Sequence, residues 1–319
     1  MAVFTPVTAT DLAAFLLRYD IGVAISFKGI AEGVQNSNFL LETTAGRYIL
    51  TLYEDRVETA ALPWFLALTT HLADKHLPVP RPITDRTGTA LQTLNGRPAC
   101  LIEFVPGVSV TDPTAAQSHA IGAALGHLHT AVTDFLTERA NNLGQPHWAA
   151  MAARCNNRTG EIDPALPALI AAGLAATADW PGTLPRATIH TDLFPDNVLM
   201  LGGTVTGLID FYFACTDIRA FDYMTTHAAW CFSPDGATYH PDRATALAAG
   251  YTETHGLSAD ETAALPRLGQ GAALRFTLTR AYDWLNTPPD ALVTKKDPMA
   301  FARRLAWYTQ ATPAMVLGG

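Results

Sequence analysis

The sequence has few charged residues and no long uninterrupted hydrophobic run. Of its 319 residues, 16% are charged and 49% are hydrophobic, and no apolar stretch approaches the roughly 20 residues of a membrane-spanning helix. Lys and Arg number 21 against 29 Asp and Glu, which gives a formal net charge of −8. A nucleic-acid surface needs clustered basic residues. We therefore expect neither nucleic acid nor a membrane as a partner.

Cysteine is also scarce, and its spacing excludes two further classes of protein. The four cysteines show no C-x-x-C pattern, so neither a zinc site nor a disulfide scaffold is indicated. The N-terminus lacks the basic region of a signal peptide, which favours a cytoplasmic protein. A folded chain of this length predicts one large domain or two ordinary ones, and we favour two lobes.

The first hundred residues predict an antiparallel sheet with one long helix. Thr8 and Asp11 can cap a short first helix, and residues 58–75 repeat leucine and phenylalanine at helical spacing. The pair Asn95-Gly96 is a strong two-residue hairpin signal. Strands are predicted at residues 23–27, 38–42 and 47–53 and on either side of the hairpin turn.

The remaining residues predict mainly helices. Helical segments are expected at residues 114–136, 241–254 and 260–285, the last broken or kinked at Pro266. The exception is a small hairpin, with strands at residues 197–201 and 204–211 joined by Gly202-Gly203.

Three polar residues flank this small hairpin. Asp192 and Asn197 lie in the run His190-Thr-Asp-Leu-Phe-Pro-Asp-Asn, and Asp210 follows the returning strand. Phosphoryl transfer needs a group that positions the acceptor hydroxyl and oxygen ligands for a metal ion that neutralises phosphate charge. Taken alone, the same residues could form only an Asx-rich turn. The joint spacing favours phosphoryl transfer.

This arrangement resembles the catalytic segments of the α+β, two-lobed protein-kinase-like fold, in its aminoglycoside phosphotransferase and choline kinase branch. The resemblance implies that Asp192 is the catalytic base and that Asn197 and Asp210 are Mg²⁺ ligands, with ATP as phosphoryl donor. It implies a structural role for His190 as a brace of the loop. Asp196 is expected to cap or pair locally.

The same resemblance implies which residues contact the nucleotide. Residues 101–107 resemble the family's hinge, with Glu103 and Val105 as main-chain contacts to the adenine, although they could be only an edge strand ending at a proline. The stretch from Lys28 to Asn38 resembles the loop over the nucleotide, although any hairpin tip is similar in composition. The implied nucleotide contacts there are Gly33, Asn36, Ser37 and Asn38. The implied domains are a nucleotide-binding lobe at 1–101, a hinge at 102–108 and a helical lobe at 109–319.

Thr51 stands on the third strand where kinases of this fold usually have a phosphate-binding lysine. The substitution leaves two readings open. One is a pseudokinase that binds nucleotide without turnover. The other is an active enzyme in which a cation such as Lys28 or Arg56 supplies the charge, and the presence of Asp192, Asn197 and Asp210 favours this second reading.

Residues 32–38, 48–53, 77–82, 210–217 and 274–284 together resemble the homoserine kinases of the phosphotransferase fold. The resemblance covers almost the whole chain, and in that family threonine is expected at this strand position. The resemblance implies L-homoserine as acceptor. Arg275 or Arg280 is then a candidate for the substrate carboxylate, because arginine suits bidentate binding, although a structural pair with Asp283 is an equal alternative. Tyr212 and Asp217 are further pocket candidates. A kinase for an aminoglycoside, choline or methylthioribose is the main rival.

Overall fold

The computed structural model describes residues 5–30, 36–54, 58–288 and 295–319, and the chain divides into two compact units, residues 1–106 and 107–319. Each unit is described separately below. In the described ranges, no helix combines the length and apolar character needed to cross a bilayer.

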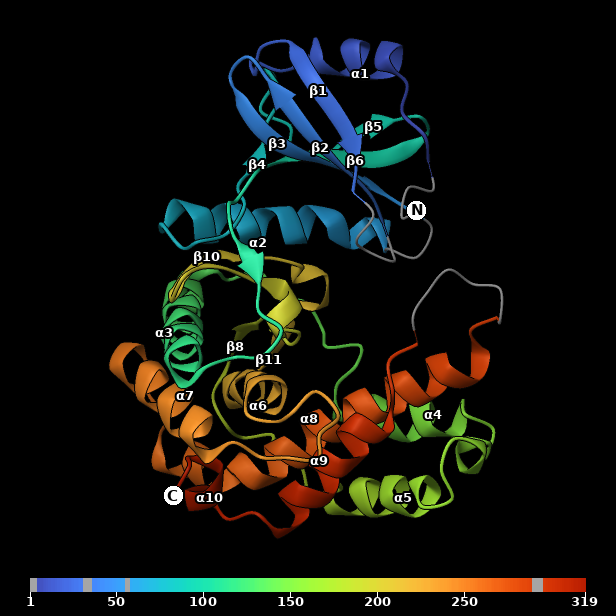
Figure 1. Ribbon diagram of the computed structural model, residues 1–319, viewed down its shortest axis with the longest axis vertical. Helices are drawn as coiled ribbons and strands as arrows, with labels where there is room; N and C mark the ends of the chain where they lie inside the picture. The colour runs from blue at the N-terminus through green and yellow to red at the C-terminus, as the bar shows by residue number, and fades with distance from the viewer. Residues whose placement is uncertain (1–4, 31–35, 55–57, 289–294) are drawn as a thin grey trace. The chain divides into compact units, whose positions relative to one another are not determined.

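The first unit is an antiparallel sheet with two helices (Figure 1). The strand order is β1-β2-β3-β6-β4, and β5 pairs with β6. A core that includes Phe15, Leu41 and Leu101 joins α1 to the sheet. The elements are α1 (Ala9–Leu16), β1 (Ala24–Gly29), β2 (Asn36–Thr43), β3 (Gly46–Tyr53), α2 (Leu62–Asp74), β4 (Pro82–Ile83), β5 (Gln92–Leu94) and β6 (Arg97–Glu103).

Local sequence signals account for these elements. Thr8 and Asp11 form the expected capping box at the start of α1. Pro63 lies in the first turn of α2, where its missing N–H costs nothing. Asn95 and Gly96 both have positive φ, at 49° and 76°, as a tight turn between β5 and β6 requires. The predicted three-stranded meander, the hairpin and both helices are confirmed.

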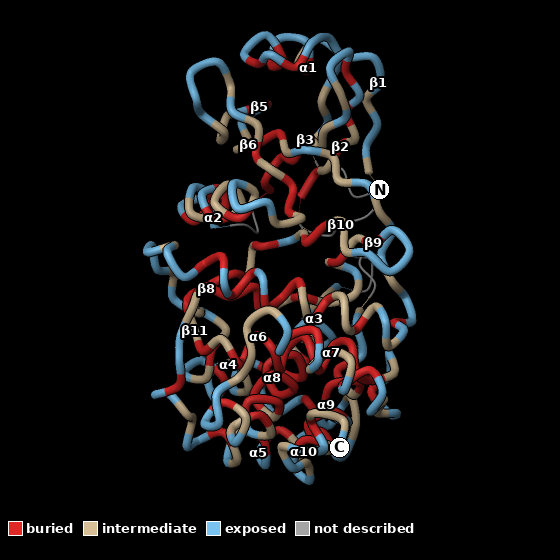
Figure 2. Tube along the Cα trace, turned by 90° about the vertical axis from the view of Figure 1, so that its left-hand side faces the viewer, coloured by how far each residue is buried: buried red, intermediate tan, exposed pale blue. Residues whose placement is uncertain are grey.

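The second unit is mainly helical, with short strands at one end (Figure 1). Buried residues concentrate along α6 and α8 (Figure 2). The strands form two small sheets, β10-β9-β7 and β11-β8. The elements are β7 (Val108–Ser109), α3 (Ala115–Ala131), α4 (Trp148–Ala153), α5 (Leu166–Ala176), β8 (Arg186–Ile189), β9 (Val198–Leu201), β10 (Thr204–Leu208), β11 (Cys215–Ile218), α6 (Arg219–Trp230), α7 (Pro241–Thr254), α8 (Ala259–Asn286), α9 (Met299–Gln310) and α10 (Pro313–Val316).

Three predicted boundaries in this unit need correction. Of the two alternatives at Pro266, a break or a kink, the break is wrong, because α8 continues from Ala259 to Asn286. A proline there costs about 3 kcal/mol, and burial of neighbours such as Leu265 and Leu268 on both sides of it offsets that cost. The helix predicted to reach residue 136 ends at Ala131 and continues as a 3₁₀ turn. The strand predicted to reach residue 211 ends at Leu208.

Helices α3 and α7 approach each other at glycines. A Cβ atom at Gly122 of α3 would overlap the backbone carbonyl of Leu247, and one at Gly250 of α7 would overlap the carbonyl of His119. Only residues without a side chain allow so close a crossing. The contact fixes the position of α3, whose last turn carries the buried His129.

Candidate active site

Residues 190–197 connect β8 to β9 and carry most of the predicted site. Thr191 has a φ of 61°, a left-handed conformation that is strained for a β-branched residue. Its hydroxyl donates a hydrogen bond of 2.9 Å to the carbonyl oxygen of Phe213. A strained residue persists only where its surroundings hold it, and several buried side chains do so here.

The carboxylate of Asp222, in the first turn of α6, binds the backbone of the loop 190–197. It accepts hydrogen bonds from the backbone N–H of His190 at 2.8 Å and from that of Thr191 at 2.6 Å. His129 Nε2 lies 3.2 Å from the same carboxylate. Burial acts to raise the pKa of Asp222, but the hydrogen bond from His129 and the neighbouring imidazoles lower it, and the net shift is downward. Asp222 is therefore a buried anion that fixes the two residues preceding Asp192.

Two further buried side chains hold the loop carbonyls. Arg275 of α8 donates to the carbonyl oxygen of Thr191 and is only 2% exposed. Its guanidinium lies 4.6 Å from the centre of the Phe276 ring. Trp230 Nε1 donates to the carbonyl oxygen of Leu193 at 2.9 Å. The loop is thus fixed from both helices that form the centre of the unit.

Asp192, Asn197 and Asp210 are brought together by the small hairpin. Asn197 Nδ2 donates to the backbone carbonyl of Asp192 at 2.8 Å and to its carboxylate at 3.1 Å. The backbone N–H of Ile209 donates to the carbonyl of Asn197 at 3.0 Å. Asp210 follows at once, with a left-handed φ of 64°, and begins the 3₁₀ turn of Phe211–Phe213.

The two aspartates share a negatively charged environment. Burial raises the pKa of Asp192 to about 7, and the charge of Asp210 adds to this effect while Arg275 opposes it. Burial likewise raises the pKa of Asp210 to about 6, with a further contribution from the charge of Asp196. A carboxyl with a pKa near neutrality suits a general base, and two such carboxyls together favour a bound cation.

His190 is completely buried beneath this site. Its Nδ1 accepts from the backbone N–H of Asp192 at 3.2 Å, and its Nε2 lies 3.0 Å from the carbonyl oxygen of Ile209. These contacts require the neutral ring with its proton on Nε2. They tie the loop to the hairpin, as a brace would.

The other residues predicted to bind substrate are Arg280, Tyr212 and Asp217, and each has different neighbours from those of Arg275. Arg280 lies on α8 beyond Arg275, with its guanidinium 4.5 Å from the centre of the Phe301 ring. Tyr212 lies two residues after Asp210, and its backbone N–H donates a hydrogen bond to the Asp210 carboxylate. Asp217 lies on β11 and accepts from Asn141 Nδ2 at 2.7 Å. Their roles stay predictions.

The predicted nucleotide residues that the structure describes belong to the first unit, and Gly33 and Arg56 fall outside the described residues. Ser37 is buried and donates to Glu54 at 2.6 Å. Asn38 Oδ1 accepts from the hydroxyl of Thr51 at 2.8 Å. Asn36 Oδ1 faces the backbone N–H of Glu54 at 3.4 Å.

The hinge candidates end this first unit. The backbone N–H of Glu103, at the end of β6, donates to the carbonyl of Arg81 at 2.9 Å. Val105 follows the strand and is half-buried. Their contacts to adenine stay predictions, as do those of Asn36, Ser37 and Asn38.

The sequence interpretation missed Asp222, His129 and Lys296. Asp222 is the one acid of α6, and this was the available signal for it. Lys296 Nζ lies 3.2 Å from Asp196 Oδ2, and both side chains are 61% exposed. Asp196 was expected to cap or pair locally, but the side-chain partner found here lies a hundred residues along the chain.

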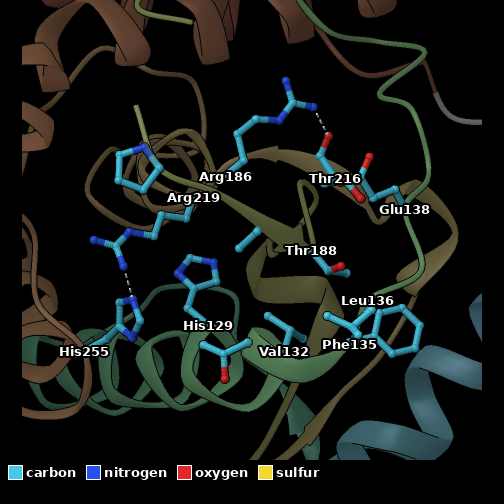
Figure 3. Close-up of a pocket in the computed structure, with 13 residues that line it drawn as sticks. His129, Val132, Phe135, Leu136, Glu138, Arg186, Thr188, Thr216, Arg219 and His255 are labelled. Carbon is cyan, nitrogen blue, oxygen red and sulfur yellow. Dashed lines mark hydrogen bonds between the residues drawn. The ribbon is translucent and has the colours of Figure 1, made fainter. Parts of the chain in front are cut away.

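Figure 3 shows His129 beside a cleft of about 300 Å³. The cleft is formed by the end of α3, strands β8 and β11, and His255 at the end of α7. On its left side, Arg219 Nη1 lies 2.6 Å from His255 Nε2 (Figure 3). None of the lining residues belongs to the loop 190–197 or to Asp210. The cleft is therefore separate from the residues predicted to be catalytic.

Solved structures of small-molecule kinases share this fold. An amicoumacin kinase in complex with AMP-PNP and Ca²⁺ superimposes with a TM-score of 0.70 at 16% identity, over 95% of this chain and 94% of that chain. A spectinomycin phosphotransferase in complex with ADP and spectinomycin gives a TM-score of 0.68 at 13% identity, over 98% of each chain. The predicted α+β protein-kinase-like fold is confirmed.

Sequence comparison is more specific. The model of the phosphotransferase enzyme family matches residues 26–257. The homoserine kinase of Acidiphilium cryptum is 51% identical over 319 residues, which is 100% of both chains. The homoserine kinase of Methylobacterium radiotolerans is 51% identical over 100% of this chain and 99% of its own. This chain therefore belongs to the phosphotransferase enzyme family, within the group of the homoserine kinases.

Proposed function

We propose that this protein transfers the γ-phosphoryl group of ATP to the side-chain hydroxyl of L-homoserine, giving ADP and O-phospho-L-homoserine on the route to threonine. The observation that carries the proposal is the 51% identity to two homoserine kinases over the full length of the chain. Asp192, Asn197 and Asp210 lie together in the arrangement that phosphoryl transfer needs.

Asp192 orients the acceptor and takes its proton. The hydroxyl oxygen of homoserine forms the new bond to the γ-phosphorus as the bond from that phosphorus to the ADP oxygen breaks, and the hydroxyl proton passes to the Asp192 carboxylate. The raised pKa of Asp192, about 7, makes its carboxylate a better proton acceptor than an exposed aspartate. The bond from Asn197 Nδ2 holds this carboxylate in one orientation.

The residues beside Asp192 fit a magnesium ion. Asn197 uses its Nδ2 on Asp192, which leaves its Oδ1 for a cation, and the Asp210 carboxylate carries charge that a cation would offset. Mg²⁺ is commonly held by one or two protein oxygens plus waters and substrate phosphates. When bound, it would neutralise charge on the transferring phosphoryl group.

Thr51 is compatible with an active enzyme. Threonine carries no charge, and the hydroxyl of Thr51 is bonded to Asn38 within the sheet. Another residue must therefore supply the cation for the nucleotide phosphates. Lys28 is exposed on β1 and stays the candidate in the first unit for the charge that the usual lysine supplies.

The acceptor assay tests this function directly. Release of ADP is measured from ATP and Mg²⁺ with L-homoserine, and separately with choline, an aminoglycoside and methylthioribose. We expect saturable turnover with L-homoserine and none above background with the others. The matched control is α-aminobutyrate, which is homoserine without the hydroxyl and should give no turnover.

Two results would reject the proposal. Absence of homoserine-dependent ADP release from folded protein would indicate a pseudokinase. Preferred turnover of choline, an aminoglycoside or methylthioribose would reassign the acceptor while keeping the kinase chemistry.

A further inference from the structure

The ion pair between Lys296 and Asp196 lies beside the predicted catalytic residues. Lys296 Nζ is 3.2 Å from Asp196 Oδ2, and both side chains are 61% exposed. A pair so exposed to solvent contributes little to stability. Separating the two charges is therefore easy if another ionic group takes the place of each partner.

The position of the pair connects it to the reaction. Asp196 directly precedes Asn197 and lies in the loop that carries Asp192. The charges of Lys296 and Asp196 act on the carboxyls of both Asp192 and Asp210. Lys296 also lies 5.9 Å from the centre of the Phe194 ring, in the same loop.

Three nearby arginines already donate hydrogen bonds to backbone carbonyls, whereas the hydrogen bond of Lys296 is to a side chain. Arg275 is buried and donates to the carbonyl of Thr191. Arg304 is buried and donates to the carbonyls of Ala300 and Ser233. Arg280 donates to the carbonyl of Asp297 at 3.2 Å and stacks on Phe301. Of these four cations, Lys296 can change partner at the lowest cost.

We propose that Lys296 and Asp196 form the subsite for the amino-acid end of the acceptor, with Lys296 binding its carboxylate and Asp196 its ammonium group. An α-amino acid carries opposite charges on adjacent groups, and it replaces one solvated ion pair by two charge-assisted contacts. Its hydroxyl end then extends toward Asp192. The proposal rests on the function proposed above and adds the basis of specificity for a zwitterion over a simple alcohol.

The test combines charge-removing variants with analogues that lack one charge. Lys296→Met should raise the KM for L-homoserine by about tenfold to a hundredfold, while the affinity for propanolamine, which lacks the carboxylate, stays unchanged. Asp196→Asn should weaken both L-homoserine and propanolamine but leave γ-hydroxybutyrate, which lacks the ammonium group, unchanged. Each analogue is measured both as a substrate and as a competitive inhibitor of homoserine turnover.

The controls separate a specific contact from a general loss of positive potential. Lys295→Met removes the neighbouring charge, whose Nζ donates to the carbonyl of Trp284, and should leave the KM for homoserine unchanged. Lys296→Arg should retain most of the affinity. The KM for ATP should be the same in every variant.

The subsite is rejected if Lys296→Met leaves the KM for homoserine unchanged, or if it weakens propanolamine as much as homoserine. Either result is distinct from failure of the proposed function, which would appear as absence of homoserine turnover in the unsubstituted protein.

Discussion

His129 Nε2 lies 3.2 Å from Asp222 Oδ2, and Asp222 in turn binds the loop that carries Asp192, the proposed catalytic base. Because Asp222 is ionised, the ring must carry its proton on Nε2. Its Nδ1 lies 2.8 Å from the hydroxyl oxygen of Tyr251. The result is a buried chain of hydrogen bonds from α7 through α3 and α6 to the N–H groups of His190 and Thr191.

This chain predicts that Asp222 positions the catalytic loop. Asp222→Asn replaces one acceptor oxygen by a donor, so one of the two loop N–H groups loses its partner. We expect kcat for homoserine phosphorylation to fall about a hundredfold, from the loss of a hydrogen bond to a charged group worth about 2–3 kcal/mol. The KM for ATP should stay within twofold. An equal loss in nucleotide affinity would show that the variant disturbs the whole unit instead.

His129→Leu should have a smaller effect of the same kind. It removes one of the three donors to Asp222, and we expect kcat to fall about tenfold with little change in KM. His119→Leu is the matched control, because His119 lies on the same helix but is exposed and paired with Glu253. If both histidine variants behave alike, the contact of His129 with Asp222 has no special role.

Asp210→Asn tests the predicted magnesium site. The substitution keeps the size of the side chain and removes the charge that a cation offsets, so the Mg²⁺ concentration for half-maximal activity should rise at least about tenfold. Asp235→Asn, at an exposed aspartate bonded to Ser233, serves as control. An unchanged Mg²⁺ dependence in Asp210→Asn would remove this residue from the metal site.

The buried His227 predicts a loss of stability in mild acid. Burial lowers its pKa to about 3, whereas the unfolded chain binds the proton at about 6.5. Between these values only the unfolded state is protonated, so stability falls as the pH drops below 6.5, by about 2 kcal/mol at pH 5.

Denaturant unfolding of His227→Gln at about pH 7.5 and pH 5 measures this contribution. The difference in unfolding free energy between the two pH values should be about 2 kcal/mol smaller than in the unsubstituted protein. His147→Gln, at an exposed histidine, should leave the difference unchanged. The same pH dependence in His227→Gln as in the unsubstituted protein would contradict the assignment.

Much of the first unit could be predicted from sequence because its signals are local. The capping box of Thr8, the Asn95-Gly96 turn and the proline in the first turn of α2 each act within four residues. The proximity of the three predicted site residues could be anticipated for a similar reason, since Asp192 and Asn197 lie five residues apart and the hairpin brings Asp210 beside them.

The residues that hold the site in place could not be found this way. Asp222 bonds to residues 31 and 32 positions away, and His129 to one 93 positions away. No periodicity or turn rule encodes such contacts. Arg275 illustrates the same limit: its residue type suggested a ligand for carboxylate, but the fold buries it against the Thr191 carbonyl.

The most direct test of the central claim is the rate at which Asp192→Asn converts ATP and L-homoserine into ADP and O-phospho-L-homoserine, followed by phosphorus NMR. Removal of the proton acceptor should lower kcat by about 10²–10⁴-fold, while ADP binding measured by equilibrium dialysis stays unchanged. Turnover near that of the unsubstituted protein would contradict the assignment of Asp192 as the base.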